Sequence, residues 1–542
     1  MGHGDDIMAT ADARRVRQAD LHQPRRKVIL GDGKRQHWTA TYEGNPHIAR
    51  PDELKAGDVV NWVLNSPYQH RPYVHPWGMT KEPPEARLPY RQDFRASPGD
   101  LFFAEGERAR AAAEAARLGR FVVVEPMTKG NFGNNKAWPV AHWERLAAIL
   151  TGEGHTVVQM GPEGVPALPF ARRVVTPSFR DAAALLAHAS LIVTTDGGLH
   201  HAAAAVGTPA VVIWGARTDP RILGYPWHRN IVADVARTSC FCASWFECAH
   251  CREAMASIDP ATVARAATEQ LGSELGGSIW IFVPSRGRPD RLAELAASAL
   301  GLARHPARVR FLVGVDRDDP AGADAYRSVA ERFLPAMDLV FLDPGRSVPA
   351  IVEGMTADAG FNYLARPSDL VMALGDDVVF RTPGWDWSLD KMLCDYPDAL
   401  VVGFMNDGRG RDKAEHVVAT RAWIEAAGYF LPRHLEHFSA DAWVEDVARR
   451  VGRRLFLEGV VAEHRHFKYG LAERDATYDM KRAPGPGGSM SERDLVRYED
   501  GAAERAATAD RIRARLAELP GMASAETAPL VPVAPPAVGA AA

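Results

Sequence analysis

The sequence contains no long apolar run, no excess of positive charge and few cysteines. No stretch approaches the roughly 20 apolar residues that a bilayer-spanning helix needs, so we expect no transmembrane segment. The formal net charge is −4, without the basic character typical of proteins that bind nucleic acids or acidic membranes. The first residues carry neither the basic nor the apolar region of a signal peptide. These absences predict a cytoplasmic protein with no nucleic-acid partner.

The number and spacing of the cysteines agree with a cytoplasmic location and suggest a metal site. Of the five cysteines, four lie close together, at Cys240, Cys242, Cys248 and Cys251. An odd total with one clustered set does not describe the disulfide framework of a secreted protein. The four thiols could form a tetrahedral structural zinc site. The alternative is that they are buried or free thiols.

The chain is too long for one hydrophobic core, at 542 residues. Over residues 118–273, buried strands alternate with helical stretches, which is typical of a parallel, doubly wound sheet. A second alternating series fills residues 274–486. Residues 1–117 indicate a reduced Rossmann-like half. Residues 487–542 predict one charged helix, over Ser491–Leu519, and a disordered Ala/Pro-rich tail from about Ala523 to Ala542. The predicted fold class is α/β.

Two loops of the first series suit a diphosphate. One runs from Pro126 to Pro139 and contains glycines and Lys136; the other runs from Thr194 to Ala202. Glycines after a strand let backbone amides approach an anion, and a lysine adds positive charge. The second loop opens a helix, so the positive end of the helix dipole faces the ligand. The alternative is that these turns merely connect strands and helices.

The residues in these loops resemble the ADP-heptose:lipopolysaccharide heptosyltransferase family, glycosyltransferase family 9. The resemblance rests on Asn135 to Pro139, on Asp196 to Ala202, on Gly207 to Pro209 and on Trp214 to Pro220, and it extends weakly to Gly4 to Thr10. It implies a GT-B fold, with two Rossmann-like halves, in which the C-terminal half holds the sugar donor.

The resemblance also implies roles for single residues. Lys136 would contact the donor phosphates, and Asp5 would be the general base that accepts the proton of the acceptor hydroxyl. The loop that holds the diphosphate would consist of Asp196, Gly197, Gly198 and His201 with their neighbours. Gly197 stands where the family usually has a hydroxyl residue. The chain also opens on its glycine–aspartate turn, without the strand that normally precedes it.

The second series places basic and acidic residues at the predicted ends of strands. Arg286 and Arg288 follow the first strand, and Asp316 ends the next one. Asp376 and Asp377 follow a later strand. Two adjacent carboxylates at such a position can bind Mg²⁺ or Mn²⁺ that also bridges a diphosphate. The alternative for the acidic pair is a solvated turn.

This order of residues resembles the GT-A fold of family 2-type glycosyltransferases. The resemblance implies that the turn with Arg286 and Arg288 and the carboxylate of Asp316 hold the nucleotide. It implies that Asp377, helped by Asp376, coordinates the metal. Asp441 is the candidate base, with Asp446 as its competitor. His464 or His466 would complete the metal shell; the alternative is that both are surface polar residues.

The sequence therefore predicts a bifunctional, inverting glycosyltransferase. Its partners would be nucleotide-sugar donors and a glycan, glycoconjugate or protein acceptor. One alternative is a single active GT-A enzyme whose front module is a degenerate binding scaffold. Another is an unrelated nucleotide-dependent enzyme on the same sheet, because a fold alone does not fix function.

Overall fold

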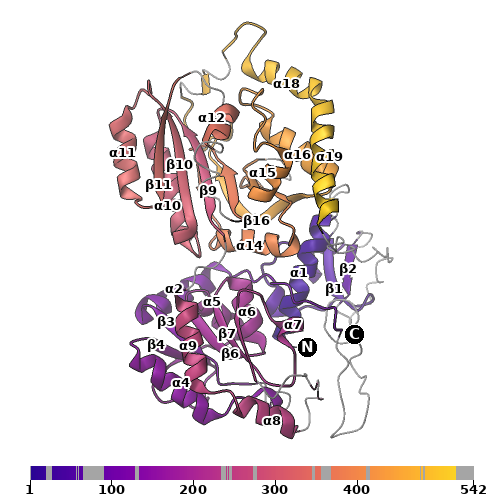
Figure 1. Ribbon diagram of the computed structural model, residues 1–542, viewed down its shortest axis with the longest axis vertical. Helices are drawn as coiled ribbons and strands as arrows, with labels where there is room; N and C mark the ends of the chain where they lie inside the picture. Colours follow the sequence, from indigo (N-terminus) through magenta and orange to yellow (C-terminus); the bar gives the residue numbers. More distant parts are fainter. Residues whose placement is uncertain are drawn as a thin grey trace. The chain divides into compact units, whose positions relative to one another are not determined.

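The computed structural model shows two compact units, one formed by Met1–Leu275 and one by Gly276–Ala525 (Figure 1). The structure describes residues 2–19, 27–55, 58, 60–64, 91–128, 134–233, 240, 242, 247–272, 277–344, 348–355, 366, 368–409, 415–475, 478–479 and 483–519. The predicted tail and residues 129–133 of the first predicted loop lie outside these ranges. Within them, none of the helices combines the length and apolar character needed to cross a membrane.

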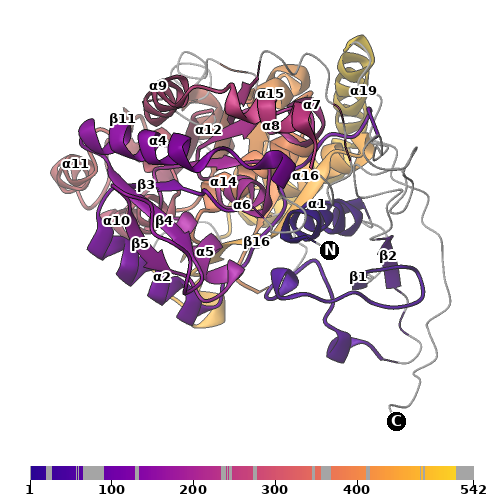
Figure 2. The same cartoon turned by 90° about the horizontal axis from the view of Figure 1, so that it is seen from below.

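The first unit contains a parallel sheet of six strands in the order β5-β4-β3-β6-β7-β8. The strands are β3 (Phe121–Val124), β4 (Thr156–Gly161), β5 (Arg172–Val175), β6 (Leu191–Thr195), β7 (Ala210–Trp214) and β8 (Arg229–Val232). The helices are α2 (Glu105–Leu118), α4 (Val140–Gly152), α5 (Phe179–Leu186), α6 (Gly198–Val206), α7 (Pro220–Leu223), α8 (Ala249–Ala256) and α9 (Pro260–Leu271). Helices α2, α5 and α6 bury one face of the sheet, and α4, α8 and α9 bury the other (Figure 2). The predicted parallel, doubly wound sheet is confirmed.

The N-terminal part of this unit holds a separate, small sheet. Strands β1 (Lys27–Gly31) and β2 (Val60–Leu64) pair in parallel, with helix α1 (His3–Ala19) against them. Two short helical turns, η1 (Ala40–Tyr42) and η2 (Pro51–Glu53), lie between the strands in sequence. Helix α1 begins at His3, so Asp5 lies in its first turn and not in a loop before it.

The second unit is built on a mixed sheet in the order β11-β10-β9-β12-β15-β14-β16-β13. Its strands are β9 (Ile279–Ser285), β10 (Val309–Asp316), β11 (Met337–Leu342), β12 (Leu370–Ala373), β13 (Val378–Phe380), β14 (Val402–Asn406), β15 (Val417–Thr420) and β16 (Arg454–His464). Strands β13 and β15 run antiparallel to their neighbours. The other six strands run in one direction, so their carboxyl ends meet at one edge, where ligands of such sheets bind.

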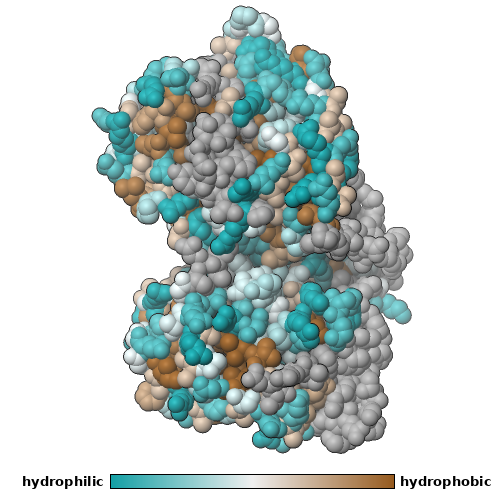
Figure 3. All heavy atoms as spheres, viewed as in Figure 1, coloured by the Kyte–Doolittle hydropathy of each residue, from teal (hydrophilic) through white to brown (hydrophobic). Residues whose placement is uncertain are grey.

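Helices cover both faces of this sheet. They are α10 (Pro289–Leu302), α11 (Ala323–Arg332), α12 (Val348–Met355), α14 (Trp385–Asp395), α15 (Arg421–Ala427), α16 (Ala440–Val451), α18 (Met490–Asp500) and α19 (Ala502–Glu518). One core lies under α10, α11 and α14, and the other under α12, α15, α16 and α19. On the face that Figure 3 shows, hydrophilic side chains alternate with smaller apolar groups.

The single helix predicted over Ser491–Leu519 is wrong, because the chain breaks at Gly501 into α18 and α19. A Cβ atom at Gly501 would lie 2.2 Å from the ring of Trp443, so this close approach requires glycine. The break lets α19 pack along α15 and α16. The compact second unit therefore extends past residue 486.

Candidate functional site

In the first unit, Lys136 and Asp196 meet at the carboxyl ends of neighbouring strands. Lys136 ends the short turn η3 (Asn134–Lys136), which follows β3 in sequence, and Asp196 directly follows β6. The Lys136 Nζ lies 2.5 Å from Asp196 Oδ2 and donates to the Asp196 carbonyl oxygen at 3.2 Å. Thr218 Oγ1 donates to the same carboxylate at 2.8 Å. The described part of the first predicted loop therefore contacts the second through Lys136 and Asp196.

Buried charges in this site balance one another. Burial lowers the pKa of the Lys136 ammonium, and the carboxylate of Asp196 only partly opposes this. For Asp196, burial would raise the pKa, but the charge of Lys136, joined at low pH by the protonated histidines of α6, reverses the effect and holds the pKa well below its usual range. Asp196 is therefore ionised, and a buried carboxylate of this kind needs its cation partner.

The two histidines of α6 are uncharged near neutral pH. His201 Nδ1 lies 2.8 Å from the hydroxyl oxygen of Tyr225. Burial lowers the pKa of His201 to about 4 and lowers the pKa of His200 further below its usual value. Gly197 precedes α6 and Gly198 is its first residue. The start of this helix thus combines neutral histidine side chains with the positive end of the helix dipole, the features with which a helix terminus receives an anion.

Helix α1 brings Asp5 to the same place. A Cβ atom at Gly4 would lie 2.5 Å from His201 Cδ2, so the first turn of α1 touches α6 directly. The ring of His3 stacks on Phe179, with centroids 4.0 Å apart. The negative charge of Asp5 acts on both Lys136 and His201, since it raises the pKa of each against the effect of burial. The structure thus brings together the predicted residues Asp5, Lys136, Asp196, Gly197, Gly198 and His201.

In the second unit, the turn after β9 contacts the end of β10. Arg286 Nη1 lies 2.8 Å from Asp316 Oδ2 and 2.6 Å from Asp318 Oδ1. The backbone amide of Gly287 donates to Asp319 Oδ2 at 2.8 Å. Gly287 has a positive φ of 69°, a conformation that favours glycine. Arg286 and Asp316, both predicted from the sequence, are therefore direct partners.

The acidic pair lies between β12 and β13 and is largely buried, with Asp376 4% and Asp377 8% exposed. Asp376 accepts from Ser285 Oγ at 2.8 Å and from Arg288 Nη1 at 3.1 Å. Asp377 accepts from the hydroxyl of Tyr478 at 2.5 Å. These partners rule out the solvated turn that the sequence left open.

Arg288 faces the acidic pair and a residue far along the chain. Its Nε and Nη2 atoms donate to the two oxygens of Asp475 at 2.8 and 2.6 Å. Its guanidinium carbon also lies 4.3 Å from the ring centroid of Tyr478. The arginine predicted to hold the donor is therefore engaged with carboxylates, and Asp475 and Tyr478 join the site without having been predicted.

Of the two predicted histidines, His464 is the one beside the acidic pair. His464 Nε2 lies 3.5 Å from Asp377 Oδ1, and its Nδ1 lies 3.3 Å from Glu415 Oε2. Burial would lower the pKa of His464, but these two carboxylates raise it to about 9. His466 instead accepts the amide of Lys468 through Nδ1 at 3.1 Å. Glu415, His416 and His464 could together ligate an ion, since their ligand atoms lie within 4.8 Å of one another.

Asp441 lies in the first turn of α16 and accepts the amide of Ala442 at 2.9 Å. Because α16 packs along β16 and directly precedes it in the chain, its first turn lies toward the edge where β16 ends. Asp446, the competing carboxylate, pairs with Arg450 at 3.0 Å and with Arg505 of α19 at 2.6 Å. Asp446 thus joins two helices.

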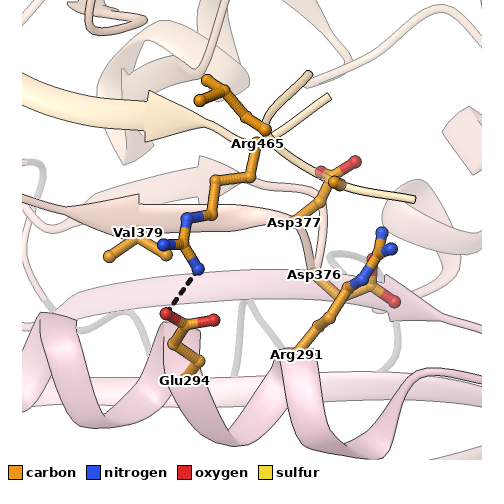
Figure 4. Close-up of a pocket in the computed structure, with 8 residues that line it drawn as sticks. Arg291, Glu294, Asp376, Asp377, Val379 and Arg465 are labelled. Atoms are coloured by element: carbon orange, nitrogen blue, oxygen red, sulfur yellow. Dashed lines mark hydrogen bonds and ion pairs between the residues drawn. The ribbon is translucent and has the colours of Figure 1, made fainter. Parts of the chain in front are cut away.

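A pocket of about 130 Å³ opens beside the acidic pair (Figure 4). It is lined by Arg291, Glu294, Asp376, Asp377, Val379, Arg465, Leu471 and Ala472. Arg465 Nη1 lies 2.6 Å from Glu294 Oε1, the ion pair drawn in Figure 4. Helix α10 and the segment after β16 are far apart in the sequence, and no local pattern marks Arg291 or Arg465 as site residues.

The four clustered cysteines of the first unit converge. All four Sγ atoms lie within 4.8 Å of one another. Cys251 Sγ lies 3.1 Å from Cys240 Sγ and 3.4 Å from Cys242 Sγ, and all five cysteines of the chain are free thiols. The arrangement has the ligand number and type of a tetrahedral thiolate site.

Residues 92–253 match the family model described as glycosyltransferase family 9 (heptosyltransferase). This region is a glycosyltransferase family 9-like domain. Over 122 residues the chain is 30% identical to lipooligosaccharide heptosyltransferase 2 of Haemophilus influenzae, a match covering 20% of this chain and 35% of that protein. The matched curated heptosyltransferases are covered over 30% to 41% of their own lengths. The family 9-like domain thus corresponds to part of each relative.

Two solved structures show weaker likeness. A family 9 glycosyltransferase from Veillonella parvula is 17% identical, with a TM-score of 0.35, over 50% of this chain and 95% of that one. The mannosyltransferase PcManGT from Pyrobaculum calidifontis, solved with GDP-Man and Mn²⁺, is 14% identical, with a TM-score of 0.29, over 47% of this chain and 81% of that one. At these TM-scores the fold assignment rests on the sheet topologies described above.

Proposed function

We propose that the chain is a bifunctional glycosyltransferase that moves sugars from nucleoside-diphosphate donors to hydroxyl acceptors with inversion. The observation that carries this proposal is the meeting of Asp5, Lys136 and Asp196 at the start of α6, within and beside the family 9-like domain. A general base, a cation and helix-end amides are the groups that inverting transfer without a metal requires. The acceptor is a glycan, glycoconjugate or protein.

In the first unit, we assign the donor diphosphate to Lys136 and the amides of Gly197 and Gly198, since the His201 amide donates to the Gly197 carbonyl oxygen at 3.4 Å. The Lys136 ammonium would shift from Asp196 toward the phosphates, while Thr218 continues to hold the Asp196 carboxylate. Asp5 would take the proton of the attacking hydroxyl. The neutral state of His201 favours this arrangement, because it leaves the lysine as the cation that meets the leaving group.

In the second unit, we assign the nucleotide to Arg286 and Asp316 and a divalent cation to Asp376 and Asp377. The chemistry of the acidic pair suits such an ion, because two largely buried carboxylates supply the hard ligands that Mg²⁺ and Mn²⁺ prefer. Glu415 lies beside this pair only through His464, which contacts both Asp377 and Glu415. When bound, the ion would stabilise the negative charge of the leaving diphosphate. His464 must release its proton before it can act as a ligand, and Asp441 is the proposed base.

Two further assignments belong to this proposal. We assign a structural zinc ion to the four clustered cysteines, since their sulfurs converge. We also place the protein in the cytoplasm, because five free thiols suit a reducing compartment.

The alternative function is a single active second unit with the family 9-like domain as a binding scaffold. It is favoured by the small N-terminal sheet, which has two strands among the described residues. A donor-binding measurement separates the two functions, because a scaffold that has lost its donor pocket shows no dependence on Lys136.

The test uses the full-length chain and calorimetry with UDP-, GDP- and ADP-sugars. We expect Lys136→Gln to weaken the binding of one donor class by about 10- to 100-fold, the worth of one or two charge-assisted hydrogen bonds. We expect Asp377→Ala to abolish metal-dependent turnover. Exposed-site variants Lys34→Ala and Asp338→Ala serve as matched controls. Unchanged donor affinity in Lys136→Gln would refute the first assignment, and unchanged turnover in Asp377→Ala the second.

A further inference from the structure

The cysteine cluster of the first unit contacts the turn that carries Lys136. The side chain of Asn135, 1% exposed, donates from Nδ2 to Cys242 Sγ at 3.4 Å. Its Oδ1 accepts the backbone amide of Cys248 at 2.9 Å. One amide side chain therefore joins two of the four cysteines, and Asn135 is the residue directly before Lys136.

A second connection reaches the other wall of the same site. The backbone amide of Cys240 donates to the carbonyl oxygen of Ala216 at 2.7 Å. Two residues later, Thr218 donates to Asp196 Oδ2 at 2.8 Å. The cysteine cluster is thus bonded to both segments that hold the Lys136–Asp196 pair.

We propose that the four cysteines bind a Zn²⁺ ion that positions Lys136 through Asn135, so that nucleotide binding by the first unit depends on the metal. The metal would sit behind the donor pocket and not in it. This inference rests on the proposed function only in taking Lys136 as the contact to the diphosphate.

The chemistry of the cluster supports zinc at this place. Four thiolates in tetrahedral reach are a ligand set that Zn²⁺ prefers, and binding releases the thiol protons as four sulfur–zinc bonds form. The Asn135 amide then donates to a metal-bound thiolate. Groups that hydrogen-bond metal ligands fix the orientation of those ligands, and their removal commonly lowers metal affinity or activity by about 10- to 100-fold. Without the ion, Asn135 Nδ2 donates to a neutral thiol sulfur of Cys242, which is a weak acceptor.

The experiment uses the full-length chain with Asp377→Ala as background and no added Mg²⁺ or Mn²⁺, so that the second unit contributes no metal-dependent binding. ADP, GDP and UDP are the probes, measured by calorimetry beside zinc content by elemental analysis. The variants are Cys242→Ser and Asn135→Ala. Cys394→Ser, the cysteine of the second unit, is the matched control.

We expect about one zinc per chain in the background protein. Cys242→Ser should lose the zinc, and its affinity for the preferred nucleotide should fall by about tenfold or more. Asn135→Ala should keep the zinc, and its affinity for the same nucleotide should fall by about tenfold. Cys394→Ser should change neither quantity. Mercurial release of the zinc from the background protein, followed by zinc repletion, repeats the test without a substitution that could prevent folding.

Each contrary result is decisive. Absence of zinc, or visible absorbance from a thiolate iron centre in the untreated protein, would overturn the metal assignment. Zinc loss with unchanged nucleotide affinity would overturn the link through Asn135. Unchanged affinity in Lys136→Gln would instead refute the proposed donor site, whatever the zinc content.

Discussion

At the scale of single residues, the end of β3 holds an acid that the proposed chemistry does not use. Glu125 follows this strand directly and accepts from Thr194 Oγ1 at 2.6 Å. Burial raises the pKa of Glu125 to about 7, with the hydrogen bond from Thr194 opposing part of the shift. The folded state therefore favours the protonated, neutral form of Glu125.

This shift predicts how the stability of the first unit depends on pH. Because the folded pKa lies above the unfolded value near 4.5, the contribution of Glu125 is fully present below about pH 4.5 and is lost as the pH rises through about 7. We expect Glu125→Gln to raise the free energy of unfolding at pH 8 by about 2 kcal/mol relative to its effect at pH 4. Denaturant titrations at both pH values measure this. Exposed Glu163→Gln is the control, and an equal effect at both pH values would refute the prediction.

Which site residues the sequence can reveal depends on how far apart their partners lie. Asp196 and Asp377 follow predicted strands closely, so the strand pattern itself places them at a sheet edge, and Lys136 lies in the loop after a third predicted strand. Tyr478 contacts Asp377 from 101 residues away, and Asp475 contacts Arg288 from 187 residues away. Both lie in a segment with no periodic pattern. A choice between His464 and His466 is not possible from the sequence alone, because it depends on the pairing of Val378 with His464 across β13 and β16.

At the scale of elements, the contact of α1 with α6 depends on a missing side chain. The ring of His201 is held by Tyr225, so it cannot easily yield to a Cβ atom 2.5 Å away at Gly4. At Gly2, the nearest atom to an added Cβ is Asp5 Oδ2 at 3.8 Å, an ordinary contact.

The two glycines therefore form a matched pair for a test. We expect Gly4→Ala to displace the first turn of α1 and to lower turnover by the first unit at least tenfold, because a displacement of about 1 Å in a reacting group can cost about 100-fold. Gly2→Ala should retain turnover. Steady-state kinetics with the donor found by calorimetry gives the comparison. Equal rates in the two variants would show that α1 is not required where we place it.

Helix α18 fixes the loop that leads to Asp441. The fully buried carboxylate of Asp494 accepts the consecutive backbone amides of Glu436, His437 and Phe438, each at 2.8 Å. Ser439 then adopts a positive φ of 62° before α16 begins. A carboxylate with this many amide donors stabilises a loop strongly, because each bond carries a charge.

We expect Asp494→Asn to lower the free energy of unfolding of the second unit by about 2 kcal/mol. The NH2 group of the asparagine would face a buried backbone N–H, which would lose its acceptor, and the remaining bonds would lose the carboxylate charge. Circular dichroism during urea unfolding measures the change. The control is Asp500→Asn, at the exposed end of the same helix. If Asp494→Asn lowered the free energy of unfolding no more than the control does, α18 would not hold this loop.

Element by element, the sequence predicts strands better than it predicts their directions or the ends of helices. The runs at 121–124, 191–195 and 210–214 are fully buried and were readable as strands. The antiparallel direction of β13 and β15 depends on connections that no short window of residues contains. The break at Gly501 depends on Trp443, which lies in another helix.

At the scale of the whole molecule, the proposed function gives one chain two ways of meeting a leaving diphosphate. The first unit offers a lysine and helix-end amides, and the second offers buried carboxylates suited to a hard cation. The first unit also carries four thiols, which suit a soft or borderline metal. The two proposed metal sites therefore differ in ligand chemistry, and they should differ in how readily a chelator empties them.

This difference predicts the response of the full-length chain to brief EDTA treatment. An ion held by carboxylates exchanges readily, whereas zinc held by four thiolates is bound by about 10 kcal/mol or more. We expect EDTA to reduce turnover by the second unit to the level of the Asp377→Ala variant. Added Mn²⁺ should then restore this turnover in the unmutated chain but not in Asp377→Ala. Nucleotide affinity of the first unit and zinc content should stay unchanged in the same samples. If EDTA left the turnover of the second unit intact, its acidic pair would have to act through Arg288 and not through a metal.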